Sequence, residues 1–150
     1  MKLRPRQVDF VHKVNYALKE KGNTLGVAPT GAGKTVMLSS VIKHAGKGKT
    51  IVLQHRDELV AQNRATYRRI DADTPTDIYA ADRKRWSDGV TFAMVQTLSR
   101  DENLATMPPV DLLVIDEAHH VAADSYLRII DRAREINPLV HIFGVTATPQ

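Results

Sequence analysis

The sequence predicts an α/β fold in which a mainly parallel sheet is covered by helices on both faces. Short, nearly continuous apolar runs alternate with segments whose apolar residues recur at helical spacing, as expected for strands buried on both sides. Unusual polar residues follow these apolar runs directly. The carboxyl ends of parallel strands share one edge, where ligands gather, so we expect one shared active face. A length of 150 residues fits a single domain with one core.

The individual elements follow from this pattern. Five apolar runs are expected to form strands, at 23–28, 49–54, 90–96, 111–116 and 141–147. Four segments are expected to form helices, at 6–19, 36–44, 56–70 and 125–136. In the third helix the residues in register are Leu59, Val60, Asn63 and Tyr67. The chain has no repeats and no linker-like segment, so no internal domain boundary is predicted.

Composition limits the setting and the partners. There is no cysteine, which excludes disulfides and thiolate metal sites and fits a reducing environment. No window has the apolar length of a membrane span, and the first residues lack a signal-peptide core, so we expect a cytoplasmic protein. The net charge is unevenly placed: Lys and Arg outnumber acids 14 to 6 in residues 1–75, whereas acids lead 11 to 7 in residues 76–150. A basic half favours a polyanionic partner, although an ordinary solvated surface fits charge alone equally well.

The stretch APTGAGKT (28–35) has the pattern of a Walker A phosphate loop, with Ala28 at the first glycine position. Glycines allow successive backbone N–H groups to point at one anion, and the following helix adds its N-terminal dipole. Lys34 is expected to reach the β and γ phosphates, and the Thr35 hydroxyl is expected to bind Mg²⁺. The residues predicted to bind nucleotide here are Pro29, Thr30, Gly31, Ala32, Gly33, Lys34 and Thr35.

The stretch LLVIDEAHH (112–120) supplies the acidic strand end that a P-loop protein needs. Asp116 is the expected second Mg²⁺ ligand, and Glu117 is expected to orient or activate the attacking water. The histidine spacing does not fit the His-Glu-x-x-His pattern of zinc proteases. A structural alternative, in which both acids only cap the next helix, stays open. On the phosphoryl-transfer interpretation, the predicted catalytic residues are Asp116, Glu117 and Lys34.

With APTGAGKT, DEAH (116–119) and GVTATP (144–149) in this order, the chain resembles the first RecA-like motor domain of superfamily 2 DEAH-type helicases and translocases. The segment IDEAHHVAADSYLRII (115–130) is similar to the branch that contains type III restriction motor subunits and DNA-repair helicases. The resemblance spans nearly the whole chain and implies a RecA-like three-layer fold. It also implies ATP and Mg²⁺ as cofactors.

The resemblance further implies roles for residues outside the phosphate loop. It places Gln7 on the adenine base. His119, Thr146 and Thr148 would couple nucleotide state to nucleic acid, while His120 is unassigned. The residues implied to contact the nucleic-acid backbone are His55, Arg56, Gln96 and Thr97. Trp86, in the basic loop expected at 81–89, either stacks on a base or anchors that loop.

The resemblance implies nucleic acid as partner, with DNA favoured over RNA, and a second RecA-like domain in the same full-length chain. That second domain would supply arginine residues facing the γ-phosphate, so the 150-residue chain alone is expected to hydrolyse ATP poorly. Three alternatives are weighed. These are an RNA helicase motor domain, a P-loop switch or small-molecule kinase that does not act on nucleic acid, and a nucleotide-gated binding module.

Overall fold

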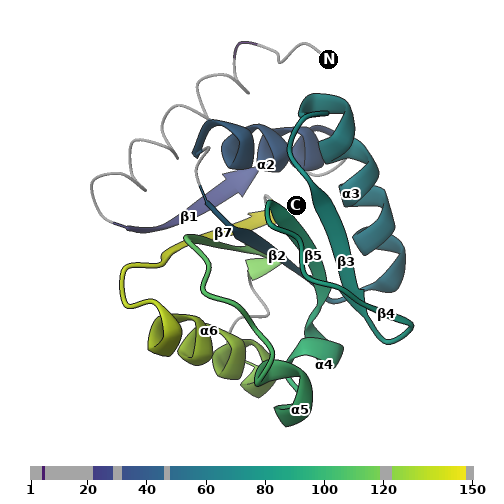
Figure 1. Cartoon of the computed structure of the whole chain (residues 1–150). Coiled ribbons are helices and arrows are strands. Elements are labelled where there is room, and N and C mark those ends of the chain that lie inside the picture. Colours follow the sequence, from purple (N-terminus) through teal and green to yellow (C-terminus); the bar gives the residue numbers. More distant parts are fainter. Residues whose placement is uncertain (1–4, 6–21, 29–31, 46–47, 119–122, 148–150) are drawn as a thin grey trace.

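Seven strands form one sheet in the order β1-β7-β6-β2-β5-β3-β4 in the computed structural model (Figure 1). The structure describes residues 5, 22–28, 32–45, 48–118 and 123–147, so the helix predicted at 6–19 lies outside the described residues. Neighbouring strands are parallel except for the β3–β4 pair, which is antiparallel. The strands are β1 (Asn23–Ala28), β2 (Thr50–Gln54), β3 (Thr76–Ala80), β4 (Arg83–Lys84), β5 (Val90–Met94), β6 (Leu112–Asp116) and β7 (His141–Ala147).

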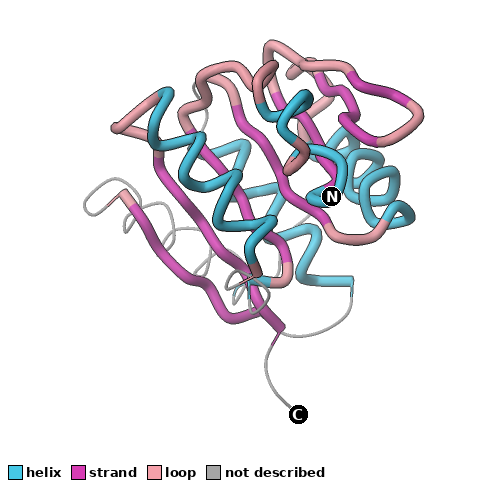
Figure 2. Tube along the Cα trace, turned by 90° about the horizontal axis from the view of Figure 1, so that it is seen from below, coloured by secondary structure: helices cyan, strands magenta, loops and turns pink. Residues whose placement is uncertain are grey.

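Helices cover both faces of this sheet, which confirms the predicted three-layer α/β class. The helices α2 (Ala32–Ala45) and α3 (Asp57–Ile70) lie on one face. The helices α4 (Val95–Leu98), α5 (Asp101–Leu104) and α6 (Asp124–Ile136) lie on the other (Figures 1 and 2). Every residue of β2, β5 and β6 is buried. Strands that pack on two helical layers must be apolar on both faces, and this explains why their sequences are continuous apolar runs.

The carboxyl end of β5 corrects one predicted boundary. The sequence predicts a strand over 90–96, but β5 ends at Met94 and the chain continues as α4 from Val95. Val95 and Leu98 are both buried on this short helix. Their three-residue spacing places them on one helical face, so Val95, which the sequence assigns to the strand, belongs to the next element. Gln96 and Thr97 therefore lie in the helical turn that directly follows the strand.

The β3–β4 hairpin corrects a second expectation. The sequence predicts a loop over residues 81–89, but this segment contains the strand β4. The hairpin is held by side chains. Trp86 stacks on Tyr79 with ring centroids 4.3 Å apart, and its indole Nε1 donates a hydrogen bond to Thr106 Oγ1 at 3.1 Å. Arg83 forms an ion pair with Asp77 at 2.8 Å. Trp86 is therefore an anchor of the hairpin rather than a free platform for a base.

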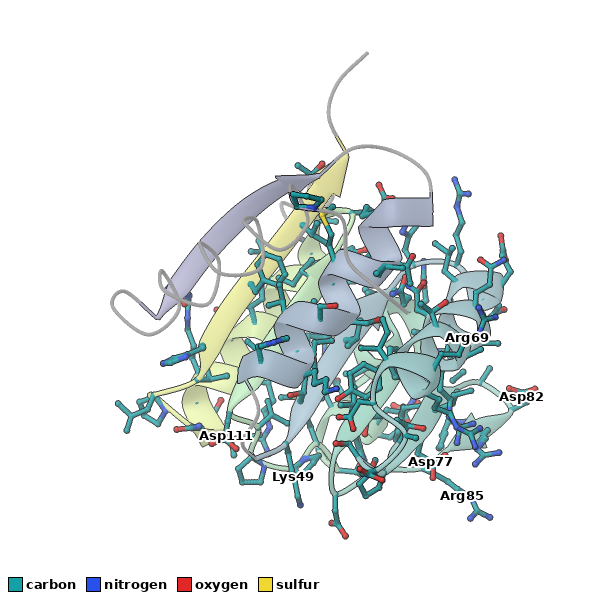
Figure 3. The ribbon with its side chains drawn as sticks, turned by 90° about the horizontal axis from the view of Figure 1, so that it is seen from above. Lys49, Arg69, Asp77, Asp82, Arg85 and Asp111 are labelled. Carbon is teal, nitrogen blue, oxygen red and sulfur yellow. The ribbon has the colours of Figure 1, made fainter. Side chains whose placement is uncertain are left out.

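Charged side chains gather around this edge of the molecule, where Figure 3 labels Arg69, Asp77, Asp82 and Arg85. Both signs are present, so the edge is a mixed surface rather than a continuous basic stripe. Figure 3 also shows Lys49 and Asp111 at the opposite end from the strand arrowheads. There Gly48, with φ +89°, makes the turn into β2, and the Lys49 N–H donates to Asp111 Oδ2 at 3.0 Å.

None of the helices within the described residues has the length and apolar character needed to cross a membrane.

Candidate nucleotide and nucleic-acid site

The phosphate-loop residues Gly33, Lys34 and Thr35 lie in the first turn of α2, which begins at Ala32, while β1 ends at Ala28. A helix start leaves backbone N–H groups without intrahelical partners and carries the positive end of the helix dipole. The motif thus has the preceding strand and the following helix that it requires. Pro29, Thr30 and Gly31 lie outside the described residues.

Lys34 joins the two motifs that the sequence analysis assigned to one site. Its Nζ lies 2.8 Å from Asp116 Oδ1 and 2.7 Å from Glu117 Oε1, across 83 residues of sequence in the second case. Burial by itself lowers the pKa of Lys34, but hydrogen bonds and charge attraction from both carboxylates outweigh burial and raise the pKa above its ordinary value. Lys34 is thus held as a cation between the two acids.

The carboxylates occupy the carboxyl end of β6. Asp116 is the last residue of that strand and is 2% exposed, which leaves it little access to water. Glu117 follows with φ 60°, the left-handed region that residues other than glycine rarely adopt. Its N–H donates to Asp116 Oδ1 at 2.9 Å. This turn aims the Glu117 carboxylate back at Lys34 and away from the continuation of the strand.

A third side chain, which the sequence analysis did not assign to the site, connects Thr35 to Asp116. Thr35 Oγ1 donates to Asn63 Oδ1 at 3.2 Å, and Asn63 Nδ2 donates to Asp116 Oδ2 at 3.4 Å. Asn63 belongs to α3 and is 2% exposed. The available signal was its position among Leu59, Val60 and Tyr67, because a polar side chain on a buried helix face needs polar partners.

The donor set fits a magnesium ion. Mg²⁺ prefers hard oxygen ligands and usually binds one or two protein oxygens together with phosphate oxygens and water. The Thr35 hydroxyl and the Asp116 carboxylate are two such oxygen ligands. The Asn63 amide, which is hydrogen-bonded to both, holds them close to each other. The pair of carboxylates carries one more charge than the Lys34 ammonium neutralises, which favours a divalent cation.

The residues predicted to contact nucleic acid come together at the carboxyl ends of β2 and β5, which pair in parallel. His55 and Arg56 follow β2, and Arg56 is the exposed residue before the first turn of α3. Gln96 Nε2 approaches the His55 carbonyl oxygen at 3.5 Å. Thr97 lies in the same short helix as Gln96, and its carbonyl accepts from Asn103 at 2.8 Å. The β2 strand also pairs with β6, so this group lies beside the carboxylates along one edge.

The predicted coupling residues are only partly described. Thr146 lies on β7, one residue after Val145, which is in register with Asp116. This position puts Thr146 next to the acidic strand end, between β1 and β6. Gln7, His119, His120 and Thr148 lie outside the described residues.

A cavity lies away from both candidate sites. A cavity of about 520 Å³ opens at the amino ends of the strands, where Thr50, Asp111 and His141 are among its lining residues. It is at the far end of the sheet from Lys34 and Asp116, so it belongs to neither candidate site.

A lysine of the phosphate loop that meets an Asp-Glu pair across the carboxyl edge of a parallel sheet is the arrangement of a P-loop nucleotide-binding domain. The motif order and the fold make this chain a first RecA-like motor domain of superfamily 2. The family model described as "Type III restriction enzyme, res subunit" matches residues 1–150, and the chain belongs to that family.

Similar proteins agree with this assignment. The chain is 33% identical over 162 residues to the protein named "Putative ATP-dependent helicase IRC3" of Saccharomyces cerevisiae, covering 97% of this chain but only 23% of that protein. Two solved structures share the fold. The SWI2/SNF2 ATPase core of Sulfolobus solfataricus, in complex with dsDNA, has a TM-score of 0.77 and 18% identity, with 99% of this chain and 32% of that one covered. The Hef helicase domain of Pyrococcus furiosus has a TM-score of 0.74 and 22% identity, with coverage of 100% and 36%.

Proposed function

We propose that this chain is the ATP-binding motor domain of an ATP-dependent DNA helicase or translocase, in which hydrolysis of Mg-ATP drives movement along nucleic acid. The observation that carries the proposal is the contact of Lys34 Nζ with Asp116 and Glu117, at 2.8 and 2.7 Å. It brings the phosphate-binding lysine and both acids to one point, as phosphoryl transfer from a nucleotide requires.

Each residue has a distinct task in this proposal. Lys34 would exchange a carboxylate for the β and γ phosphates when nucleotide binds, and Thr35 and Asp116 would hold Mg²⁺. The bound cation would neutralise charge on the transferring phosphoryl group. Glu117, freed from Lys34, accepts a proton from the attacking water. The left-handed backbone at Glu117 would serve this step, because it already directs the carboxylate toward Lys34, the residue expected to bind the phosphates.

Nucleic acid would lie across the group formed by His55, Arg56, Gln96 and Thr97. Arg56 offers a charged donor for phosphate, and the start of α3 next to it offers free N–H groups. DNA is favoured over RNA because a relative that is 30% identical over 98% of this chain is named "ATP-dependent DNA helicase MPH1" in Saccharomyces cerevisiae. We also propose that Gln7 binds adenine, that His119, Thr146 and Thr148 couple the two sites, and that a second RecA-like domain completes the motor. The chain spans 23% of the yeast relative, which leaves ample length for such a domain there.

Two substitutions in the full-length protein test the proposal. Lys34→Ala is expected to abolish binding of a fluorescent ATP analogue. Glu117→Gln is expected to retain binding and to lower DNA-stimulated ATP hydrolysis by about 10²–10⁴-fold, the usual contribution of a general base. Retained turnover in Glu117→Gln would remove Glu117 from the chemistry. Hydrolysis that no nucleic acid stimulates would favour a P-loop switch instead, and stimulation by RNA alone would favour the RNA helicase alternative.

The chain supplies matched controls for both changes. Lys43 lies on the same helix as Lys34 but is exposed and bonds only the Ile70 carbonyl among the contacts described, at 3.1 Å. Glu135 lies on the surface of α6 and pairs with Arg132 at 3.1 Å. Lys43→Ala and Glu135→Gln are expected to leave both nucleotide affinity and turnover at wild-type values.

A further inference from the structure

We propose that Asn63 is a positioning residue that holds Thr35 and Asp116 in the geometry needed to bind Mg²⁺. This inference rests on the proposed function and extends it to a helix, α3, that contributes no residue to either nucleotide motif. The geometry that supports it is the double hydrogen bond of one buried amide, which accepts from Thr35 at 3.2 Å and donates to Asp116 at 3.4 Å.

The direction of the first hydrogen bond has a chemical consequence. A threonine hydroxyl has one proton and two lone pairs, and only a lone pair can bind a cation. Asn63 Oδ1 accepts a hydrogen bond from the Thr35 hydroxyl, so the hydroxyl proton points at Asn63 and the lone pairs of Thr35 Oγ1 point elsewhere. Without this acceptor the hydroxyl would be free to turn its proton toward the cation.

Because of the second hydrogen bond, the two oxygens of the Asp116 carboxylate have different partners. Oδ1 accepts from Lys34 and from the Glu117 N–H, whereas Oδ2 accepts from Asn63. Both oxygens are therefore fixed in direction, and the carboxylate cannot rotate about its χ2 bond without losing hydrogen bonds. Because Asp116 is 2% exposed, water does not readily replace a lost partner.

Burial supports a positioning role over a simple packing role. The Asn63 side chain is 2% exposed on a helix face that otherwise packs Val60 and Tyr67 against the sheet. An apolar residue of similar size would fill that space at no desolvation cost. Retaining an amide there makes sense where its two partners need to be held. Groups behind metal ligands typically change metal affinity by about 10–100-fold when removed.

The test is a magnesium titration of nucleotide binding in the full-length protein, followed with a fluorescent ATP analogue. Asn63→Leu is expected to bind the analogue in EDTA within about twofold of wild type, because the phosphate loop is intact. The Mg²⁺ concentration that gives half-maximal enhancement of binding is expected to rise by about tenfold or more. An unchanged Mg²⁺ requirement in Asn63→Leu would overturn the inference while leaving the proposed function in place. Absence of nucleotide binding by the wild-type protein would overturn both.

Two further variants separate positioning from general damage to the fold. Asn103 is also a buried asparagine with two side-chain hydrogen bonds, to Thr97 and Tyr79, but it lies outside the phosphate site. Asn103→Leu is expected to leave the Mg²⁺ requirement unchanged. In a Thr35→Val background, adding Asn63→Leu is expected to raise the Mg²⁺ requirement less than it does in wild type, because the two residues act through one hydrogen bond. Full additivity of the two changes would overturn the part of the inference that concerns Thr35 and would leave Asp116 as the residue that Asn63 positions.

Discussion

Glu117 carries its functional carboxylate on a backbone that few residues tolerate. Its φ of 60° lies in the left-handed region, where a Cβ atom costs roughly 1–2 kcal/mol. The hydrogen bond from its N–H to Asp116 and the contact of its side chain with Lys34 offset part of this cost. Backbone strain of this kind concentrates at functional sites, where the surrounding contacts hold the residue in place.

This strain predicts an unusual order of stability among variants. Both Glu117→Gly and Glu117→Ala lose the contact with Lys34, but only alanine retains a Cβ in the left-handed conformation. Glu117→Gly is expected to be more stable than Glu117→Ala by about 0.5–1 kcal/mol, after the greater chain entropy of glycine is subtracted. Urea denaturation of the two variants measures the difference. At Glu135, in the last turn of α6, the order should reverse, with alanine more stable than glycine by up to about 1 kcal/mol.

The helices and strands differ in how clearly the sequence predicts them. The strands β2, β5 and β6 are buried on both faces, and their continuous apolar runs predict them well. The strand β3 was not predicted because it is only partly buried and begins with Thr76 and Asp77, which contribute no apolar alternation. The two-residue strand β4 has no apolar residue at all. Its position depends on pairing with β3, which no local pattern encodes.

The candidate site shows the same division between local and distant information. The Lys34, Thr35, Asp116 and Glu117 assignments came from motifs whose residue types follow from phosphate and metal chemistry, and the structure brings these residues together. Asn63 was not assigned because its role depends on two partners that lie 28 and 53 residues away. A buried polar residue in a helix can be recognised from sequence, but its partners come only from the packing of α3 against α2 and the sheet.

The carboxyl end of α3 provides a pH-dependent contribution to stability. Tyr67 is buried, and its hydroxyl donates to Asp71 Oδ2 at 2.8 Å. Burial alone would raise the pKa of Asp71, but hydrogen bonds from Thr74 and Tyr67 outweigh it and lower the pKa below its ordinary value. A carboxyl whose pKa is lower in the folded state stabilises the fold above its ordinary pKa of about 3.9. This stabilisation is lost as the pH falls through the folded value.

Tyr67→Phe removes one of these hydrogen bonds and tests the sign. We expect the variant to lose about 1 kcal/mol of unfolding free energy at pH 7. The difference from wild type should shrink as the pH falls through the lowered pKa of Asp71 in the folded protein, where the carboxylate becomes protonated. Urea denaturation between pH 3 and 7 measures this. Tyr126→Phe is the matched control, because the buried Tyr126 hydroxyl has no hydrogen-bond partner among the residues that the structure describes. Its removal should cost little at any pH in that range. A penalty for Tyr67→Phe that stays constant when the titration is carried on to a pH at which folded Asp71 is protonated would exclude Asp71 as its cause.

At the scale of the whole molecule, the strand order sets the two candidate sites side by side. The strand β6 carries the carboxylates, and its neighbour β2 leads into His55 and Arg56. The helix α3 then starts at Asp57 and returns past the phosphate site through Asn63. One sheet edge and one helix therefore connect the two candidate sites, without a long path through the core.

This arrangement is only one side of the proposed motor. An arginine facing the γ-phosphate contributes about 10³–10⁵ in rate, and we propose that a second RecA-like domain supplies it. The 150-residue chain alone is therefore expected to bind Mg-ATP but to hydrolyse it at least about 10³-fold more slowly than the full-length protein with DNA. A phosphate-release assay on both proteins, at equal site concentration, makes the comparison. Rapid, DNA-stimulated turnover by the short chain would show that it needs no arginine from another domain.

Trp86 is the only tryptophan in the sequence, and its stacking on Tyr79 gives the domain an internal fluorophore. The indole is partly shielded by Tyr79 and bonded to Thr106, so it emits from an environment less polar than water. When β3 and β4 separate, the ring meets bulk solvent and its emission shifts to longer wavelength. The hairpin edge, which carries none of the candidate site residues, thereby provides an optical signal for unfolding without any added label.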